Sequence, residues 1–335
     1  MKDYNGFIGS YTRKESKGIR RFRFNEEEFQ MEDFYEVHDP TYLSLSMDET
    51  ILYSSMRDKG DHGVLSMDLQ RGVVDKVLFT NENTPCHVST FENHLLASNY
   101  HEGKLDLYET EEGMVKRRLE SIRHEGRGPM EKRQDASHVH FAMKNPHNED
   151  ILVCDLGTDK VYIYRLEDKE LNKVGDILLP PGSGPRHLSF LPKAKFLYIL
   201  SELSAEVFVY DFRDGEYTLK QVQKTLPEDF HGENTGAAIR ITPDNRFLYV
   251  SNRGHNSLTS FRIKDNHLLE KIETVSSEGD HPRDFNISPD GEFLLLANMI
   301  SNNLVLYKID RDTGRLSLLR KDLPTPEPVS IVFMK

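Results

Sequence analysis

Arginine and histidine recur beside proline in this chain, in short contexts that repeat along it. Arg186 and His187 follow Pro185, and Arg283 follows Pro282. The planar guanidinium group of arginine matches carboxylate or phosphate oxygens with two parallel hydrogen bonds. Two guanidinium groups that face one narrow space repel each other unless an anion or a carboxylate lies between them. If the fold brings these residues together, they predict a binding site for a small anion.

These residues belong to an internal repeat, which indicates the elements that position them. Copies of the pattern start at residues 40, 85, 136, 185, 236, 282 and 328, so neighbouring copies are 45 to 51 residues apart. Each copy holds four short runs rich in β-branched and aromatic residues, such as 196–201 and 207–210. Such runs, with period-two alternation, are typical of strands, and repeats of this length are typical of four-stranded propeller blades. No stretch shows the pattern of an amphipathic helix.

The two ends of the chain complement each other within this repeat. The last copy starts at Pro328 and ends at Lys335 after its first run, whereas the chain opens with the second and third runs, at 6–10 and 18–24. Joining the two ends in one sheet leaves only short protected edges, whereas an open solenoid needs atypical caps. We therefore predict an all-β fold, a seven-bladed β-propeller with four antiparallel strands per blade. The C-terminal strand is expected to join the N-terminal blade, and residues 1–335 are expected to form a single domain.

In such a propeller the first run of each copy lines the central channel, and the second run lies antiparallel beside it. Residues that open the first runs and close the second runs therefore meet at one mouth of the channel. The expected opening pairs are Thr41-Tyr42, Cys86-His87, Ser137-His138, Arg186-His187, Ala237-Ala238, Arg283-Asp284 and Val329-Ser330, and the expected closing residues are Arg57, Asn99, Asp155, Glu202, Arg253, His255 and Asn298. Two long connections, 123–135 and 227–235, lead to the same mouth, and such loops usually serve binding.

Composition and charge exclude several classes of function. A net charge of −12 argues against nucleic-acid binding, although it allows a local cluster of arginines. No apolar run reaches the roughly 18 residues of a membrane span, and the N-terminus lacks the apolar segment of a secretory signal. Cys86 and Cys154 are too few and too far apart for a disulfide framework. Neither zinc-type ligand spacing nor a glycine-rich phosphate loop appears. We expect a cytoplasmic monomer or weak homodimer without metal, cofactor, nucleic-acid or membrane partner.

Six segments together resemble the lactonase family of seven-bladed propellers, which includes 6-phosphogluconolactonases and the fungal carboxymuconate lactonizing enzymes. These segments are 8–12, 137–140, 184–187, 201–203, 251–255 and 281–285. The resemblance covers nearly the whole chain and implies that a lactone ring is opened or closed. In the lactonizing branch a histidine, two arginines and a glutamate near the channel mouth are the proposed functional set. By motif these fall on His138, Arg186, Glu202 and Arg253, with Arg240 and Arg283 as alternatives to Arg253.

The resemblance implies a hydrolase of the 6-phosphogluconolactonase type, with a small anionic lactone as its ligand. Water must lose a proton as it attacks the lactone carbonyl, and Glu202 or His138 is expected to be the base, a role worth about 10² to 10⁴ in rate. Arg186 is expected on the oxyanion or a carboxylate, and Arg253 with Arg283 on the phosphate. The residues expected to complete the substrate-binding set are His87, His140, His187, Arg283 and Asn298.

Several alternatives stay open at this point. The same residues suit the reverse, lactonizing reaction, and a propeller can also be a non-catalytic interaction platform. His87 and His187 can instead fill a repeat position and hydrogen-bond between blades, and Glu202 can be a salt bridge that neutralises Arg186. Cys86 is not expected to form a nucleophilic pair with His87, because adjacent strand residues point to opposite faces.

Overall fold

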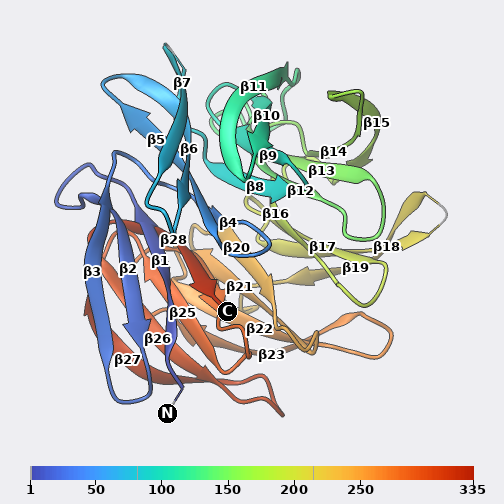
Figure 1. Ribbon diagram of the computed structural model, residues 1–335. Helices are drawn as coiled ribbons and strands as arrows, with labels where there is room; N and C mark the ends of the chain where they lie inside the picture. Colours follow the sequence, from blue (N-terminus) through green and yellow to red (C-terminus); the bar gives the residue numbers. More distant parts are fainter. Residues whose placement is uncertain (1, 81, 214) are drawn as a thin grey trace.

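The computed structural model describes residues 2–80, 82–213 and 215–335, and these ranges contain 28 strands and no helix. The strands form seven antiparallel sheets of four strands each, arranged as blades around a ring (Figure 1). With no helix in the described ranges, none is long and apolar enough to cross a membrane. The prediction of an all-β, seven-bladed propeller is confirmed.

We number the blades from the one that contains both chain ends and give the strands from the channel outward. Blade 1 contains β28 (Pro328–Met334), β1 (Tyr4–Ser10), β2 (Gly18–Phe24) and β3 (Phe29–Glu36). Blade 2 contains β4 (Leu43–Leu45), β5 (Ile51–Asp58), β6 (Asp61–Asp68) and β7 (Val74–Thr80), and blade 3 contains β8 (His87–Phe91), β9 (His94–Asn99), β10 (Lys104–Glu111) and β11 (Met114–Arg123). Blade 4 contains β12 (Val139–Lys144), β13 (Asp150–Asp155), β14 (Lys160–Glu167) and β15 (Glu170–Leu178), and blade 5 contains β16 (Pro185–Phe190), β17 (Phe196–Ser201), β18 (Glu206–Arg213) and β19 (Glu216–Lys224). Blade 6 contains β20 (Thr235–Ile241), β21 (Phe247–Arg253), β22 (Ser257–Ile263) and β23 (Leu269–Ser276), and blade 7 contains β24 (Pro282–Ile287), β25 (Phe293–Asn298), β26 (Asn303–Ile309) and β27 (Leu316–Pro324).

The place of a strand within its blade explains its sequence. Most residues of the second strands are buried, and β17 is buried along its whole length, because neighbouring blades cover both faces of these strands. They therefore read as continuous apolar runs. The outermost strands, such as β19, alternate between half-buried and exposed residues because only one face packs against a neighbour.

The hydrophobic core lies between adjacent blades. One cluster joins Leu152 and Val161 of blade 4 to Leu188 and Phe208 of blade 5. Because each blade packs in this way on the next, the ring is rigid, and it holds the starts of the inner strands in fixed positions around the channel.

Strand β28 closes the ring by pairing with β1, and Figure 1 shows the two chain ends in the same blade. Phe7 lies opposite Val332, and Ile8 lies opposite Ile331. The closure predicted from the incomplete repeats is confirmed. Phe22 of this blade packs in one cluster with Phe293 of blade 7, which joins the first and last blades of the ring.

Four inner strands, β12, β16, β24 and β28, carry a β-bulge at their second residue, and in β28 the extra residue is Val329. In β16, Pro185 and His187 pair with successive residues of β17, so Arg186 is the extra residue. His140 of β12 and Arg283 of β24 are the extra residues of the equivalent bulges. A bulge interrupts the ladder locally and re-aims the extra side chain. His140, Arg186 and Arg283 therefore occupy equivalent positions in their blades.

The start predicted at Ala136 for one copy of the repeat is wrong. The equivalent strand, β12, begins at Val139, in the position that Pro185 has in β16. Ala136 belongs to the long connection 124–138 between blades 3 and 4. Consequently His140, and not His138, is the counterpart of Arg186.

Candidate active site

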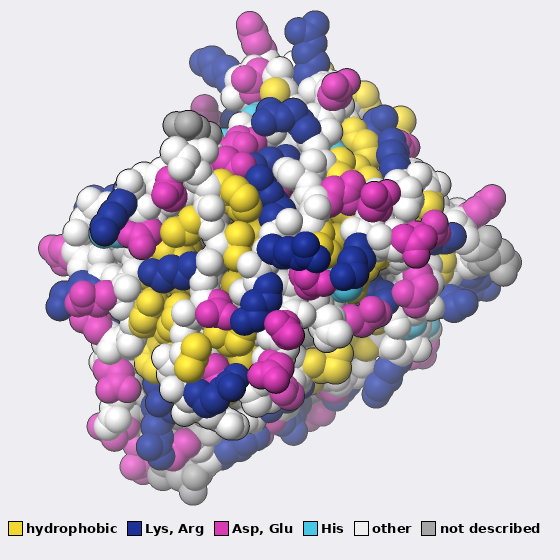
Figure 2. Space-filling view, turned by 45° about the horizontal axis from the view of Figure 1, so that its top comes forward, with side chains coloured by type: hydrophobic (Ala, Val, Ile, Leu, Met, Phe, Trp, Pro, Cys, Tyr) yellow, Lys and Arg dark blue, Asp and Glu magenta, His cyan; other side chains and the backbone are white. Residues whose placement is uncertain are grey.

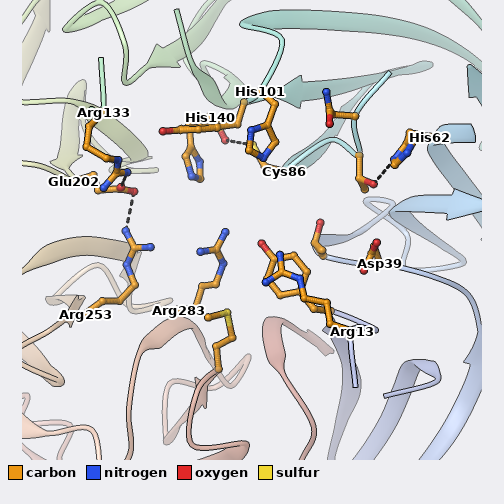
Figure 3. A pocket seen from close by; sticks show the side chains of 16 residues that line it. Arg13, Asp39, His62, Cys86, His101, Arg133, His140, Glu202, Arg253 and Arg283 are labelled. Atoms are coloured by element: carbon orange, nitrogen blue, oxygen red, sulfur yellow. Dashed lines mark hydrogen bonds and ion pairs between the residues drawn. The ribbon is translucent and has the colours of Figure 1, made fainter. Parts of the chain in front are cut away.

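A cavity of about 470 Å³ lies at the end of the ring where the inner strands begin (Figure 3). Its lining side chains come from all seven blades and their connections, and they are Tyr11, Arg13, Asp39, Thr41, His62, Asn83, Thr84, Cys86, Tyr100, His101, Arg133, His140, Glu202, Arg253, Arg283 and Met299. Four of the predicted site residues are in this lining: His140, Glu202, Arg253 and Arg283. The others, which are His87, His138, Arg186, His187 and Asn298, lie outside it.

The cavity differs in charge from the chain as a whole. The face shown in Figure 2 has acidic and basic side chains interspersed, in a chain whose net charge is −12. Inside the cavity, four arginines line the wall with two carboxylates, Asp39 and Glu202; the arginines are Arg13, Arg133, Arg253 and Arg283. Guanidinium groups that outnumber carboxylates in a cleft attract anions.

Glu202 is the centre of the charged cluster. It follows β17 directly, and its backbone is held by a hydrogen bond to Gly184 on one side and from Gly236 on the other. Its side chain is 2% exposed and forms ion pairs with Arg133, Arg186 and Arg253. Oε2 lies 2.7 Å from Nη2 of Arg253 and 2.9 Å from Nε of Arg186, although the latter contact is not oriented as a hydrogen bond.

The cluster shifts the proton affinity of its members. Burial by itself raises the pKa of Glu202, but the attraction of Arg253 and Arg186 outweighs burial and holds this pKa far below its usual range. Burial, together with repulsion from Arg253, lowers the pKa of Arg186 to about 9. At neutral pH Glu202 is therefore an ionised carboxylate with little tendency to accept a proton. The interpretation of Glu202 as a salt-bridge partner fits this geometry better than its role as general base.

Arg133 is a cavity residue that the sequence analysis did not single out. It lies on the long connection 124–138, which length alone had indicated as a binding loop. The adjacent Gln134 is fully buried and donates hydrogen bonds to the carbonyl of Leu156 at 2.8 Å and to Asp159 at 2.7 Å. These bonds fix the loop, so Arg133 reaches Glu202 from a defined position. The other long connection, 225–234, contributes nothing to the lining of this cavity.

His140 points into the cavity from the bulge of β12 (Figure 3). Its ring is 5% exposed, and its Nδ1 atom is buried without a hydrogen-bond partner among the described residues. Burial, reinforced by the nearby charge of Arg186, holds the pKa of His140 well below its usual range. The imidazole is therefore neutral at pH 7.

His138 lies outside the cavity with both ring nitrogens engaged. Nδ1 is 2.9 Å from the carbonyl oxygen of Tyr100, and Nε2 is 3.1 Å from Oδ1 of Asp135. Its ring stacks on Tyr100 with centroids 4.3 Å apart. Because both nitrogens face oxygen acceptors, no ring lone pair is directed at the cavity. In this geometry His138 supports the cavity wall.

Aromatic rings fill the channel beneath the cavity. His87 lies 4.3 Å from Tyr42 and 6.0 Å from His187, centroid to centroid. Both histidines are 2% exposed, and burial holds the pKa of each well below its usual range. Nε2 of His187 is 3.0 Å from Nη1 of Arg186, and Nδ1 of His87 accepts from the backbone of Ala142 in the next blade. The interpretation of His87 as a bond between blades fits these contacts.

Two further predicted residues lie away from the cavity. Asn298 is fully buried at the end of β25 and donates to the carbonyl of Ser277 at 2.9 Å. Arg240, one alternative to Arg253, instead pairs with Asp284 at 3.0 Å and contacts Tyr42. Of the three arginines considered for this role, which are Arg240, Arg253 and Arg283, Arg253 both lines the cavity and pairs with Glu202, as Arg133 also does.

In the part of the chain that the structure describes, no group of three or more histidine, cysteine, aspartate or glutamate residues is placed to hold a metal ion. Cys86 lines the cavity, but its thiol lies 3.4 Å from the carbonyl oxygens of both Ser98 and His140. Burial raises the pKa of this thiol to about 11, so it is protonated at neutral pH.

Fold and site together define a seven-bladed β-propeller with an arginine-rich pocket that contains a neutral histidine. The same class emerges from comparison with known families, since the model described as "Lactonase, 7-bladed beta-propeller" matches residues 5–333. The chain belongs to this lactonase family.

Known relatives agree with this assignment over the full chain. A 6-phosphogluconolactonase of Bacillus subtilis is 36% identical, and the match covers 100% of this chain and 99% of the relative. A crystal structure of a protein from Lactobacillus plantarum superposes with a TM-score of 0.93 at 32% identity, covering 100% of both chains. A periplasmic gluconolactonase of Pseudomonas aeruginosa superposes with a TM-score of 0.90 at 26% identity, covering 100% of this chain and 99% of that one.

Proposed function

We propose that this protein hydrolyses a sugar-phosphate lactone, 6-phosphogluconolactone, in the arginine-lined cavity. The observation that carries this proposal is the neutral imidazole of His140 inside a pocket where guanidinium groups outnumber carboxylates. Such a pocket suits an anionic ester, because it attracts the anion and offers both a base and cationic donors. The name of the Bacillus relative, 6-phosphogluconolactonase, supports the choice of substrate.

In the proposed mechanism His140 accepts a proton from a water molecule, whose oxygen bonds to the lactone carbonyl carbon. Arg253 lines the cavity and stabilises the resulting oxyanion, a contribution of about 3 kcal/mol for one well-placed donor. The bond between this carbon and the ring oxygen then breaks, and protonated His140 returns the proton to the ring oxygen. The product is the open-chain hydroxy acid.

Glu202 acts in this mechanism as a positioning residue. Its carboxylate holds Arg253 and Arg133 at the cavity wall and offsets part of their repulsion. Arg186 does not line the cavity, but it forms an ion pair with the same carboxylate. The sequence-based hypothesis that Glu202 or His138 is the base stays a prediction, and the contacts of both residues favour His140 for this role.

The test is the rate of lactone hydrolysis, corrected for spontaneous ring opening, in two matched variants. His140→Gln is expected to lower kcat by about 10²-fold or more, because a positioned base is lost. His138→Gln serves as the control and is expected to retain kcat within a few fold. Thermal unfolding of both variants checks that the fold is kept. If His138→Gln loses turnover and His140→Gln keeps it, the assignment of the base is wrong.

A wild-type protein that hydrolyses neither 6-phosphogluconolactone nor gluconolactone would overturn the proposed function itself. A cytoplasmic location for this reaction also stays a prediction, since the Pseudomonas relative is described as periplasmic.

A further inference from the structure

A second cationic group occupies the side of the cavity formed by blades 7 and 1. The Cζ atom of Arg13 lies 3.7 Å from the centre of the Tyr11 ring, and that of Arg283 lies 5.6 Å from the same centre. All three side chains line the cavity. Figure 3 shows Arg283 and Arg13 directed into it from the side opposite His101 and His140.

This pair differs from the arginines around Glu202 in one respect. Arg133, Arg186 and Arg253 share a carboxylate, whereas within the described ranges no carboxylate forms an ion pair with Arg13 or Arg283. Two guanidinium groups held on one aromatic ring repel each other, and the arrangement is relieved when an anion binds between them. The uncompensated pair is therefore the stronger attractor for the most highly charged part of a ligand.

The position of Arg13 is built into the fold. Arg13 lies in the connection between β1 and β2, and Oε2 of Glu327 accepts hydrogen bonds from the backbone N–H groups of Arg13 and Lys14, both at 3.0 Å. The backbone N–H of Thr12 donates to Asp39 at 3.2 Å. These bonds fix the backbone of Arg13, while its guanidinium group packs on the Tyr11 ring.

Glu327 also links this loop to the closure of the ring. It directly precedes β28, the strand that completes blade 1, and its side chain is buried. Its backbone carbonyl accepts from the N–H of Tyr11 at 3.1 Å, so both its backbone and its side chain hold the loop. Arg283 comes from the bulge of β24 in blade 7. The junction between the first and last blades therefore assembles the pair from opposite ends of the chain.

We propose that Arg13 and Arg283 form the subsite for the phosphate of the sugar-phosphate lactone, and that Glu327 positions Arg13 within it. This inference rests on the proposed function. It places the phosphate on Arg13 and Arg283, where sequence analysis had expected Arg253 with Arg283, and it leaves Arg253 on the reacting carbonyl. The lactone then spans the cavity from Arg283 to His140.

The test compares a phosphorylated and a neutral lactone in matched variants. Arg13→Ala and Arg283→Ala are expected to raise KM for 6-phosphogluconolactone by about 10- to 100-fold, as for the loss of a charge-assisted contact, with kcat nearly unchanged. Hydrolysis of gluconolactone is expected to change less than about twofold, because this substrate has no phosphate. Arg21→Ala, an exposed arginine of β2 outside the cavity, is the control and should behave as wild type. Equal losses on both lactones, or no change on either, would overturn the subsite.

Variants of Glu327 test whether this residue positions Arg13 or only stabilises the fold. Glu327→Ala is expected to raise KM for the phosphorylated lactone as Arg13→Ala does, and Glu327→Gln is expected to restore most of it, because the amide oxygen still accepts from the loop backbone. A Glu327→Ala variant that loses activity on both lactones alike contradicts the positioning role.

A binding measurement distinguishes failure of the subsite from failure of the proposed function. Calorimetric titration with 6-phosphogluconate and with inorganic phosphate needs no turnover. If wild type hydrolyses neither lactone but binds 6-phosphogluconate, and Arg13→Ala and Arg283→Ala weaken this binding, then the proposed function fails and the anion subsite stands. If lactone hydrolysis is present and both variants bind 6-phosphogluconate as wild type does, the subsite fails and the function stands.

Discussion

Replacing Glu202 with glutamine tests whether one buried carboxylate holds the arginine cluster together. The substitution keeps the shape of the side chain and removes its charge. Arg186 and Arg253, whose side chains are 3% and 7% exposed, then lose their counter-ion. Arg133 stays hydrated, because its side chain is 38% exposed. Removing one partner of a buried ion pair costs about 3–5 kcal/mol. For a chain of this length that corresponds to a fall in Tm of about 4–7 °C.

The loss has a defined pH dependence. The folded-state pKa of Glu202 lies far below its ordinary value of 4.5, because the attraction of the arginines outweighs burial. Its contribution to stability is therefore fully present above the unfolded pKa and is lost as pH falls through the folded pKa. We expect the difference in the free energy of unfolding between wild type and Glu202→Gln to be constant from pH 7 to pH 5. The difference should shrink as the pH falls below about 4.5.

An added anion should replace part of the missing charge. A ligand that binds only the folded state at 100 times its Kd stabilises it by about 2.7 kcal/mol. Phosphate is therefore expected to raise the stability of Glu202→Gln more than that of wild type, because the variant has the larger cationic excess.

The assay is urea unfolding followed by far-ultraviolet circular dichroism, since the chain has no Trp for fluorescence. Glu170→Gln, an exposed carboxylate on β15, controls for the loss of one negative charge and should unfold as wild type does. A Glu202→Gln variant with wild-type stability at pH 7 and no additional response to phosphate would refute the reasoning.

Three further outcomes are expected. Deleting residues 328–335 should abolish the cooperative unfolding transition, because it removes the inner strand of blade 1; a shortened protein that still unfolds cooperatively contradicts the closure. Cys86→Ser should retain lactone hydrolysis within a few fold, because burial keeps the thiol protonated with a pKa of about 11, and complete inactivation of a folded variant would make Cys86 a reacting group. Protonation of His140 removes the base, so activity is lost as pH falls through the lowered pKa of His140. Corrected kcat should therefore stay level from pH 8 to below 6.5, and a decline centred above 6.5 would argue against His140 as the base.

The architecture could be predicted from the sequence because its signals are local and repeated. Alternation within runs such as 21–24 reports which residues face a neighbouring blade, since Phe22 and Phe24 are buried there and the two arginines are exposed. Seven copies of one pattern report the number of blades. The closure also followed from the sequence, since the run after Pro328 and the run at 6–10 are complementary parts of one copy. These features depend on hydrophobic burial that every blade repeats.

Part of the candidate site was also visible in the sequence. The positions that open inner strands and close second strands identified Arg283, Glu202 and Arg253 as neighbours, because strand order in a blade fixes where those ends meet. His140 was also among the expected substrate-binding residues. Its equivalence to Arg186 could have been read by aligning Val139 with Pro185, but the long connection before β12 displaced the start of that copy.

Only the tertiary structure decided the chemistry available to these residues. Whether a carboxylate is a base or a counter-ion depends on charges from other blades, and Glu202 pairs with arginines 69 and 51 residues away in the chain. Arg13 and Arg133 lie on irregular loops, whose paths are set by contacts with Glu327 and with Asp159 through Gln134. Loop positions and bulges follow from such distant contacts and not from periodicity. Alternation therefore predicts where strands lie. It does not predict which side chains a bulge or a loop directs into the cavity.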